Sequence, residues 1–183
     1  MKTEYIFKDV KIKAIKGVMP EEVAGVTDNA GEAENGFCFF AVKGEKYNGA
    51  DFIGEAASNG AAIIVTEDEN AEAGGAAVIV VDDIREVLDV VCKRFYLGDS
   101  PKIKLIGVVG TNGKTSVCHI IYEIFSYAGK KAAYLGTIGG KIGEKEYETS
   151  LTTPRTVELY RFIGEAEKEG AEYLALELSA HAI

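Results

Sequence analysis

The sequence feature that most constrains the fold is a glycine-rich loop between an apolar run and an amphipathic segment. The apolar run covers residues 103–109, the loop at residues 110–116 reads GTNGKTS, and helical spacing over residues 115–128 stops at Gly129. A buried strand, a glycine loop and a helix in this order are typical of the opening unit of a parallel α/β sheet. Ligands of such sheets bind beyond the carboxyl ends of the strands, so this loop is the first candidate site.

Strand and helix signals keep alternating after the loop. Apolar runs predict strands at residues 131–135 and 173–178, and a glycine-rich hairpin is expected around residues 139–143. Helical spacing predicts a helix at about residues 156–169. These segments predict a doubly wound parallel sheet of the P-loop kind.

The first part of the chain has shorter apolar runs. They predict buried strands at residues 37–42, 61–66 and 76–81. Helical spacing predicts a helix at residues 50–59 and another at residues 84–97, for which Asp82 or Asp83 is the candidate cap. The expected architecture is a small mixed sheet with helices.

The residues between the two zones read GDSP at positions 98–101, a combination that ends a helix and favours a loop. We place the domain boundary there. The result is a small mixed-sheet domain at residues 1–100 and the start of a P-loop domain at residues 101–183.

Charge and composition exclude several functions. The formal net charge of −9 would repel a nucleic-acid backbone, and no apolar run approaches the ~20 residues of a membrane span. The first residues, MKTEYIFKDVKIKAIKG, lack the apolar stretch of a signal peptide. We therefore expect a cytoplasmic protein without nucleic-acid or membrane partners. The widely spaced Cys38, Cys92 and Cys118 are expected to be buried, reduced thiols.

Each residue type in the loop suits the binding of a triphosphate. Gly110 and Gly113 let the backbone turn its N–H groups toward one point, and the following helix adds its positive dipole end. Lys114 can reach the outer phosphates, and the Thr115 hydroxyl can ligate Mg²⁺. The candidate ATP-binding residues are Gly110, Thr111, Asn112, Gly113, Lys114, Thr115 and Ser116.

A simpler interpretation of the loop is a glycine turn that carries an exposed lysine. The general P-loop signature has four residues between its first glycine and the Gly-Lys pair, whereas five separate Gly107 from Gly113. Only the shorter pattern Gly-x-x-Gly-Lys-Thr is present. The strand and helix on either side favour ATP, with Mg²⁺ as its counter-ion.

Four motifs resemble those of the Mur ligase superfamily and follow the same order. They are GTNGKTS at residues 110–116, LGTIG at 135–139, LTTP at 151–154 and LELSAHA at 176–182. The set resembles the MurE class, the ligases that extend UDP-N-acetylmuramoyl-L-alanyl-D-glutamate. Upstream, residues 27–29, 36–44 and 48–53 are similar to the uridine-nucleotide-binding domain of that class.

This resemblance implies an ATP-dependent amide ligase of peptidoglycan synthesis, a monomer as the full enzyme. ATP would phosphorylate the terminal carboxylate of the UDP-muramoyl dipeptide, and the amine of an amino acid would attack the acyl phosphate. Lys114 and Glu177 would be catalytic, with Glu177 a Mg²⁺ ligand beside Thr115. The residues expected to contact the substrate are Thr27, Asn29, Glu45, Lys46, Tyr47, Thr152, Thr153, Ser179 and His181.

Simpler interpretations exist for some of these residues. Glu177 could be a solvated charge at a strand end, and Thr152 and Thr153 could end a loop and cap the next helix. The chain also departs from the family pattern. Asp28-Asn29-Ala30 stands where the family has Asp-Ser-Arg, which removes a hydroxyl and a positive charge.

Family members continue well beyond this length. We therefore expect a shortened chain, inactive alone, whose last sheet has an open edge and uncovered apolar surface. Other functions stay open. One is another Mur-superfamily ligase of the MurF, cyanophycin synthetase or folylpolyglutamate synthase type, and another is a non-catalytic nucleotide-sugar binding module.

Overall fold

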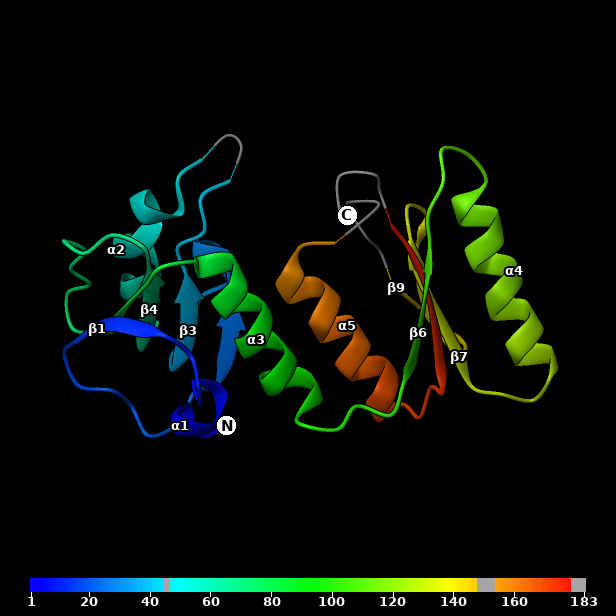
Figure 1. Cartoon of the computed structure of the whole chain (residues 1–183), viewed down its shortest axis with the longest axis horizontal. Helices are drawn as coiled ribbons and strands as arrows, with labels where there is room; N and C mark the ends of the chain where they lie inside the picture. The colour runs from blue at the N-terminus through cyan, green and yellow to red at the C-terminus, as the bar shows by residue number, and fades with distance from the viewer. Residues whose placement is uncertain (45–46, 148–153, 179–183) are drawn as a thin grey trace. The chain divides into compact units, whose positions relative to one another are not determined.

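The computed structural model describes residues 1–44, 47–147 and 154–178. The chain divides into two compact units, Met1–Phe95 and Tyr96–Ile183 (Figure 1). The division falls inside α3 (Ile84–Leu97), a few residues before the loop where the sequence predicts a domain boundary. Each unit is built around its own sheet.

The sheet of the first unit is mixed, as the sequence predicts. Its strand order is β1-β5-β4-β3-β2, with β1 antiparallel to β5 and the other neighbours parallel. The strands are β1 (Ile12–Lys16), β2 (Gly25–Thr27), β3 (Phe37–Phe40), β4 (Ile63–Thr66) and β5 (Ala77–Val81). The three apolar runs form the buried centre, while β1 and β2 lie at the edges and carry no apolar run by which to predict them.

Four short helices and the longer α3 complete the first unit. The short ones are α1 (Thr3–Ile6), η1 (Ala30–Glu32), η2 (Gly49–Phe52) and α2 (Ile53–Ser58). The predicted helix at residues 50–59 is therefore corrected to a 3₁₀ turn followed by a short α-helix. Asn48 causes the early start, because its Oδ1 accepts the N–H of Ala50 at 3.3 Å. Asp83 caps α3, accepting the N–H groups of Arg85 and Glu86 at 2.9 and 3.0 Å.

The sheet of the second unit has the order β6-β10-β7-β8-β9. Its strands are β6 (Lys104–Val108), β7 (Ala132–Gly136), β8 (Gly139–Ile142), β9 (Lys145–Tyr147) and β10 (Tyr173–Glu177). The predicted parallel arrangement is present where β10 pairs with both β6 and β7. The predicted glycine-rich hairpin extends this parallel core with two antiparallel strands, β8 and β9.

Helices α4 (Lys114–Tyr127) and α5 (Thr156–Lys168) lie on opposite faces of this sheet (Figure 1). The alternation of side chains along β10 serves both faces. Leu174 and Leu176 belong to the core under α5, with Phe162 and Ile163 of that helix. Tyr173 points to the other face, where its ring stacks on Phe125 of α4 at 3.9 Å between centroids. Residue 177 falls on the α4 face by the same alternation.

An apolar stripe on α4 and the strand β6 are exposed in the described part of the chain. In the described part of the chain, β6 is an edge strand. The outer row of α4 follows the helical repeat and is largely exposed, at 44–96% for Val117, Ile120, Ile124 and Tyr127. Apolar side chains therefore occupy both faces of this helix, and only one face is covered.

Cys38, Cys92 and Cys118 are free and buried, which confirms their interpretation as packing residues. Burial, and secondarily the charge of Glu177, raises the pKa of the Cys118 thiol to about 11. No helix of the described ranges is long and apolar enough to cross a bilayer.

We expect Leu174→Ala to lower the free energy of unfolding of the second unit by about 2–5 kcal/mol, because Leu174 is completely buried. Ile124→Ala is the matched control and should change it by less than about 0.5 kcal/mol, because that side chain is 60% exposed. Urea titration followed by circular dichroism measures both. Equal losses would contradict the packing described here.

The thiols should be inert in the folded chain. Because the pKa of Cys118 is raised to about 11, very little of it is present at pH 8 as the thiolate, the form that reacts with disulfide reagents. A chromogenic disulfide reagent should therefore label none of the three cysteines quickly under native conditions and all of them in denaturant. Fast native labelling of one thiol would show that its burial is incomplete.

Candidate functional site

The glycine-rich loop leaves the carboxyl end of β6 and leads directly into α4. Gly110 has φ 151° and Gly113 has φ 78°, so both occupy backbone conformations that favour glycine. Gly113 is the N-cap residue of α4, and no side chain of the described ranges caps this helix end. The first N–H groups of α4 therefore point out of the loop, and the first turn carries no acidic residue. This is the arrangement that binds phosphate groups.

Lys114 lies over the loop. Its Nζ donates to the carbonyl oxygen of Gly110 at 2.9 Å. The ammonium group thus lies beside the loop that precedes the N-terminus of α4. A cation and a helix N-terminus directed at one point attract an anion more strongly than either alone.

Glu177 is brought to the loop by β10, which lies between β6 and β7. Its side chain is only 4% exposed. Its Oε2 accepts the hydroxyl of Thr115 at 3.0 Å and the backbone N–H of Thr137 at 2.9 Å. The interpretation of Glu177 as a solvated strand-end charge is therefore wrong: the carboxylate is buried and held by donors from the first turn of α4 and from the residue that follows β7.

These donors decide the charge of Glu177. Burial alone would raise its pKa, but hydrogen bonds from the Thr137 N–H and the Thr115 and Thr137 hydroxyls act the other way. Together with the nearby Lys114 ammonium, they hold the pKa of Glu177 below its ordinary value. The carboxylate is therefore ionised at neutral pH.

A buried, ionised carboxylate beside a threonine hydroxyl is the kind of oxygen donor set that Mg²⁺ prefers. Thr115 and Glu177 thus fit the ion that the sequence predicts. Among the described residues, no group of three or more His, Cys, Asp or Glu side chains could hold a metal ion. A site of one carboxylate and one hydroxyl leaves the remaining ligand positions to phosphate oxygens and water, as is usual for Mg²⁺.

The predicted ATP-binding residues lie in one loop and in the first turn of α4. Glu177, at the end of β10, contacts this group through the hydroxyl of Thr115. Their contacts with a nucleotide stay predictions. Six predicted substrate residues lie outside the described residues: Glu45, Lys46, Thr152, Thr153, Ser179 and His181.

Three other predicted substrate residues lie in the first unit. The Thr27 hydroxyl is buried and accepts the N–H of Asn29 at 3.0 Å. Asn29 caps η1, accepting the N–H of Gly31 at 3.1 Å and donating to Glu32 at 3.0 Å. Tyr47 is 71% exposed, and its ring packs nearly perpendicular to that of Phe52 with 6.2 Å between the centroids. Nucleotide contact by these residues stays a prediction; Asn29 and Tyr47 are exposed, whereas Thr27 is buried.

Sequence reasoning missed the contribution of Gly136 and Thr137. Both belong to the LGTIG motif, which marked the family resemblance without a role for either residue. Thr137 acts through its backbone N–H, a donor that no side-chain pattern reveals. Only the pairing of β10 with β7 brings it to Glu177.

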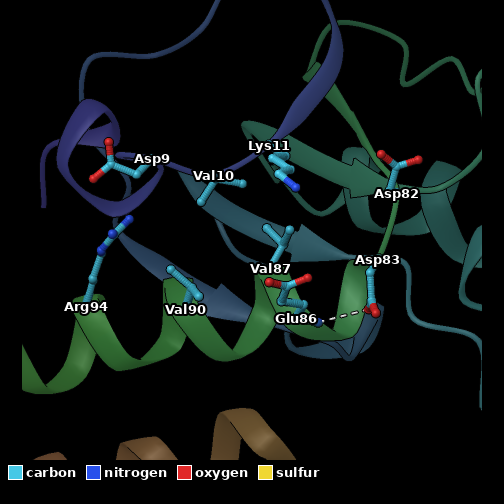
Figure 2. Close-up of a pocket in the computed structure, with 9 residues that line it drawn as sticks. All are labelled: Asp9, Val10, Lys11, Asp82, Asp83, Glu86, Val87, Val90 and Arg94. Atoms are coloured by element: carbon cyan, nitrogen blue, oxygen red, sulfur yellow. Dashed lines mark hydrogen bonds between the residues drawn. The ribbon is translucent and has the colours of Figure 1, made fainter.

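A pocket of about 300 Å³ in the first unit contains none of the predicted site residues. Figure 2 shows four carboxylates around it together with two cationic side chains. Its charged lining residues are Asp9, Lys11, Asp82, Asp83, Glu86 and Arg94. The Arg94 guanidinium already donates hydrogen bonds to the backbone oxygens of Ile6 and Lys8. A diphosphate would meet a net negative wall here, so this pocket is unsuited to a nucleotide.

Comparison with known families identifies the chain. Residues 22–96 match the catalytic domain model of the Mur ligase family, and residues 108–183 match the Mur ligase middle domain. The chain belongs to the Mur ligase family. The middle-domain match contains the loop, α4 and Glu177, so the site described above lies within a domain of this family.

Similar proteins carry one name. The chain is 35% identical to the UDP-N-acetylmuramoyl-L-alanyl-D-glutamate--2,6-diaminopimelate ligase of Geobacter sulfurreducens over 183 residues, which is 100% of this chain and 36% of that protein. It is 40% identical to the ligase of the same name from Brucella melitensis over 163 residues, 88% of this chain and 33% of that protein. The chain thus spans about a third of the length of these relatives.

Solved structures agree. A structure of a ligase with this name superposes with a TM-score of 0.78 at 26% identity, covering 99% of this chain and 36% of the other. The MurF ligase of Thermotoga maritima in complex with ADP gives a TM-score of 0.60 at 26% identity, covering 85% and 32%. The fold is therefore that of a part of a Mur ligase.

We expect Gly113→Ala to destabilise the second unit by about 1–2 kcal/mol, through backbone strain alone. An added Cβ would meet no atom within 4 Å, while the φ of 78° disfavours any L side chain. Gly54→Ala is the control: it also meets no atom but lies inside helix α2, where alanine is preferred. Thermal unfolding separates the two, and a neutral Gly113→Ala would argue against the left-handed turn.

Proposed function

We propose that this chain is the nucleotide-binding front of a MurE-type ligase, which joins an amino acid to UDP-N-acetylmuramoyl-L-alanyl-D-glutamate at the expense of ATP. The names of the relatives support this, and they point to 2,6-diaminopimelate as the amino acid. The observation that carries the proposal is the convergence of the α4 N-terminus, Lys114 and the Thr115–Glu177 pair on one point.

The chemistry requires ATP to phosphorylate the terminal carboxylate of the dipeptide before the amine attacks. In our proposal the loop N–H groups and the α4 dipole hold the β- and γ-phosphates, which orients the terminal phosphate toward the acceptor. Lys114 leaves the Gly110 carbonyl and binds the transferring phosphoryl group, stabilising the charge that accumulates there.

Thr115 and Glu177 would hold Mg²⁺, which supplies neutralisation of the phosphate charge when bound. Their own arrangement suits this task before any ion arrives. The Thr115 hydroxyl and the Glu177 carboxylate are already in contact at 3.0 Å, so little rearrangement is needed.

The first unit would bind the uridine nucleotide, in line with its match to the Mur ligase family between residues 22 and 96. Tyr47 is the exposed aromatic ring available for stacking on a base. In line with the expectations from the sequence, we propose a cytoplasmic location and a monomeric full enzyme.

Lys114→Ala should weaken Mg-ATP binding by the 183-residue chain by about tenfold or more, because a charge-assisted contact to phosphate is lost. Isothermal titration calorimetry measures the affinity, with Lys168→Ala, an exposed lysine in the last turn of α5, as the control. Unchanged affinity in Lys114→Ala would refute the assignment of the loop. Titration with UDP tests the first unit separately.

A further inference from the structure

We propose that Gly136 and Thr137, at the end of β7, form a clamp that fixes the Glu177 carboxylate in the orientation needed to bind the divalent cation of Mg-ATP. In this arrangement Gly136 and Thr137 are positioning residues, which act on the cation only through Glu177. The inference rests on the proposed function and extends it to a second loop, outside the phosphate loop.

The register of the sheet places the clamp. In β10, Leu176 pairs with Leu135 of β7 on one side, and Glu177 pairs with Val108 of β6 on the other. Glu177 therefore emerges between the loop that follows β6 and the turn that follows β7. Thr115 approaches its carboxylate from the first and Thr137 from the second.

Thr137 holds Glu177 at two points. Its backbone N–H donates to Oε2 at 2.9 Å, and its hydroxyl adds a further hydrogen bond to the carboxylate. A donor fixed in the backbone cannot rotate away, unlike the Thr115 hydroxyl. The orientation of the carboxylate therefore depends more on β7 than on the phosphate loop.

Gly136 makes this approach possible. A Cβ at this position would lie 2.6 Å from Oε2 of Glu177, closer than real Cβ atoms come, and a tight 3.0 Å from the Cβ of Glu177. The backbone of Gly136 is not in the left-handed region, so alanine would bring no backbone strain. The effect of Gly136→Ala would thus fall on the Glu177 side chain, which must turn away and lose its bonds to Thr137.

Gly107 offers a matched control. It is a strand glycine of β6 whose added Cβ would meet the Cδ1 atom of Leu178 at 2.9 Å. Gly107→Ala therefore introduces similar crowding beside the end of β10, directed at an apolar side chain and not at the carboxylate. Any general disturbance of this sheet end should affect both variants alike.

The experiment compares ATP affinity with Mg²⁺ and with EDTA, by calorimetry on the 183-residue chain. The parent and Gly107→Ala should bind ATP more tightly with Mg²⁺. In EDTA, Gly136→Ala should bind ATP as tightly as the parent, because the loop and Lys114 are untouched. In Mg²⁺, its affinity for ATP should be about tenfold or more below that of the parent. A purely structural role would lower both affinities together.

Thr137 supplies a second pair of variants in case Gly136→Ala does not fold. Thr137→Ala removes one of two donors and should lose part of the Mg²⁺ gain, whereas Thr137→Ser keeps both and should restore it. A full Mg²⁺ gain in Gly136→Ala or Thr137→Ala would overturn the clamp while leaving the proposed function intact. A parent chain that binds ATP under neither condition would overturn both.

Discussion

The second unit depends on one buried charge. Glu177 carries an ionised carboxylate at 4% exposure, and a charge in that position is tolerated only where donors replace the water it has lost. Those donors come from the phosphate loop and from the end of β7, so the carboxylate ties together the ends of three neighbouring strands. The sheet order β6-β10-β7 is what makes this possible, because the carboxyl ends of parallel strands meet at one edge.

The sequence predicted the parts of the fold that local patterns encode. The buried strands β3, β4 and β5 follow from apolar runs, and α3 follows from an apolar face and a capping aspartate. The glycine loop was predictable because strand, loop and helix are contiguous. Strand β1 was missed because four of its five residues are exposed, and its pairing with β5 is a long-range contact that no local pattern records.

The candidate site likewise depends on long-range contacts that local sequence patterns do not record. Thr115 and Glu177 were paired in advance only through the family resemblance, since 62 positions separate them in the chain. The role of Thr137 was beyond prediction from residue types, because it donates a backbone N–H and any residue except proline has one. The requirement at Gly136 is likewise a matter of space next to a residue of another strand, which sequence spacing does not reveal.

The turn after β2 shows how a departure from the family pattern is accommodated. The family has serine and arginine where this chain has Asn29 and Ala30. The Asn29 side-chain amide makes both of its hydrogen bonds locally, to Gly31 and Glu32, and so stabilises the turn as an N-cap.

Ala30 is 5% exposed, and its carbonyl oxygen accepts the side-chain amide of Asn59 at 2.9 Å. Asn29 thus stabilises a turn in which residue 30 is a buried alanine and carries no positive charge. No arginine of this turn is therefore available to pair with an anionic nucleotide, while contact through Thr27 or Asn29 stays a prediction.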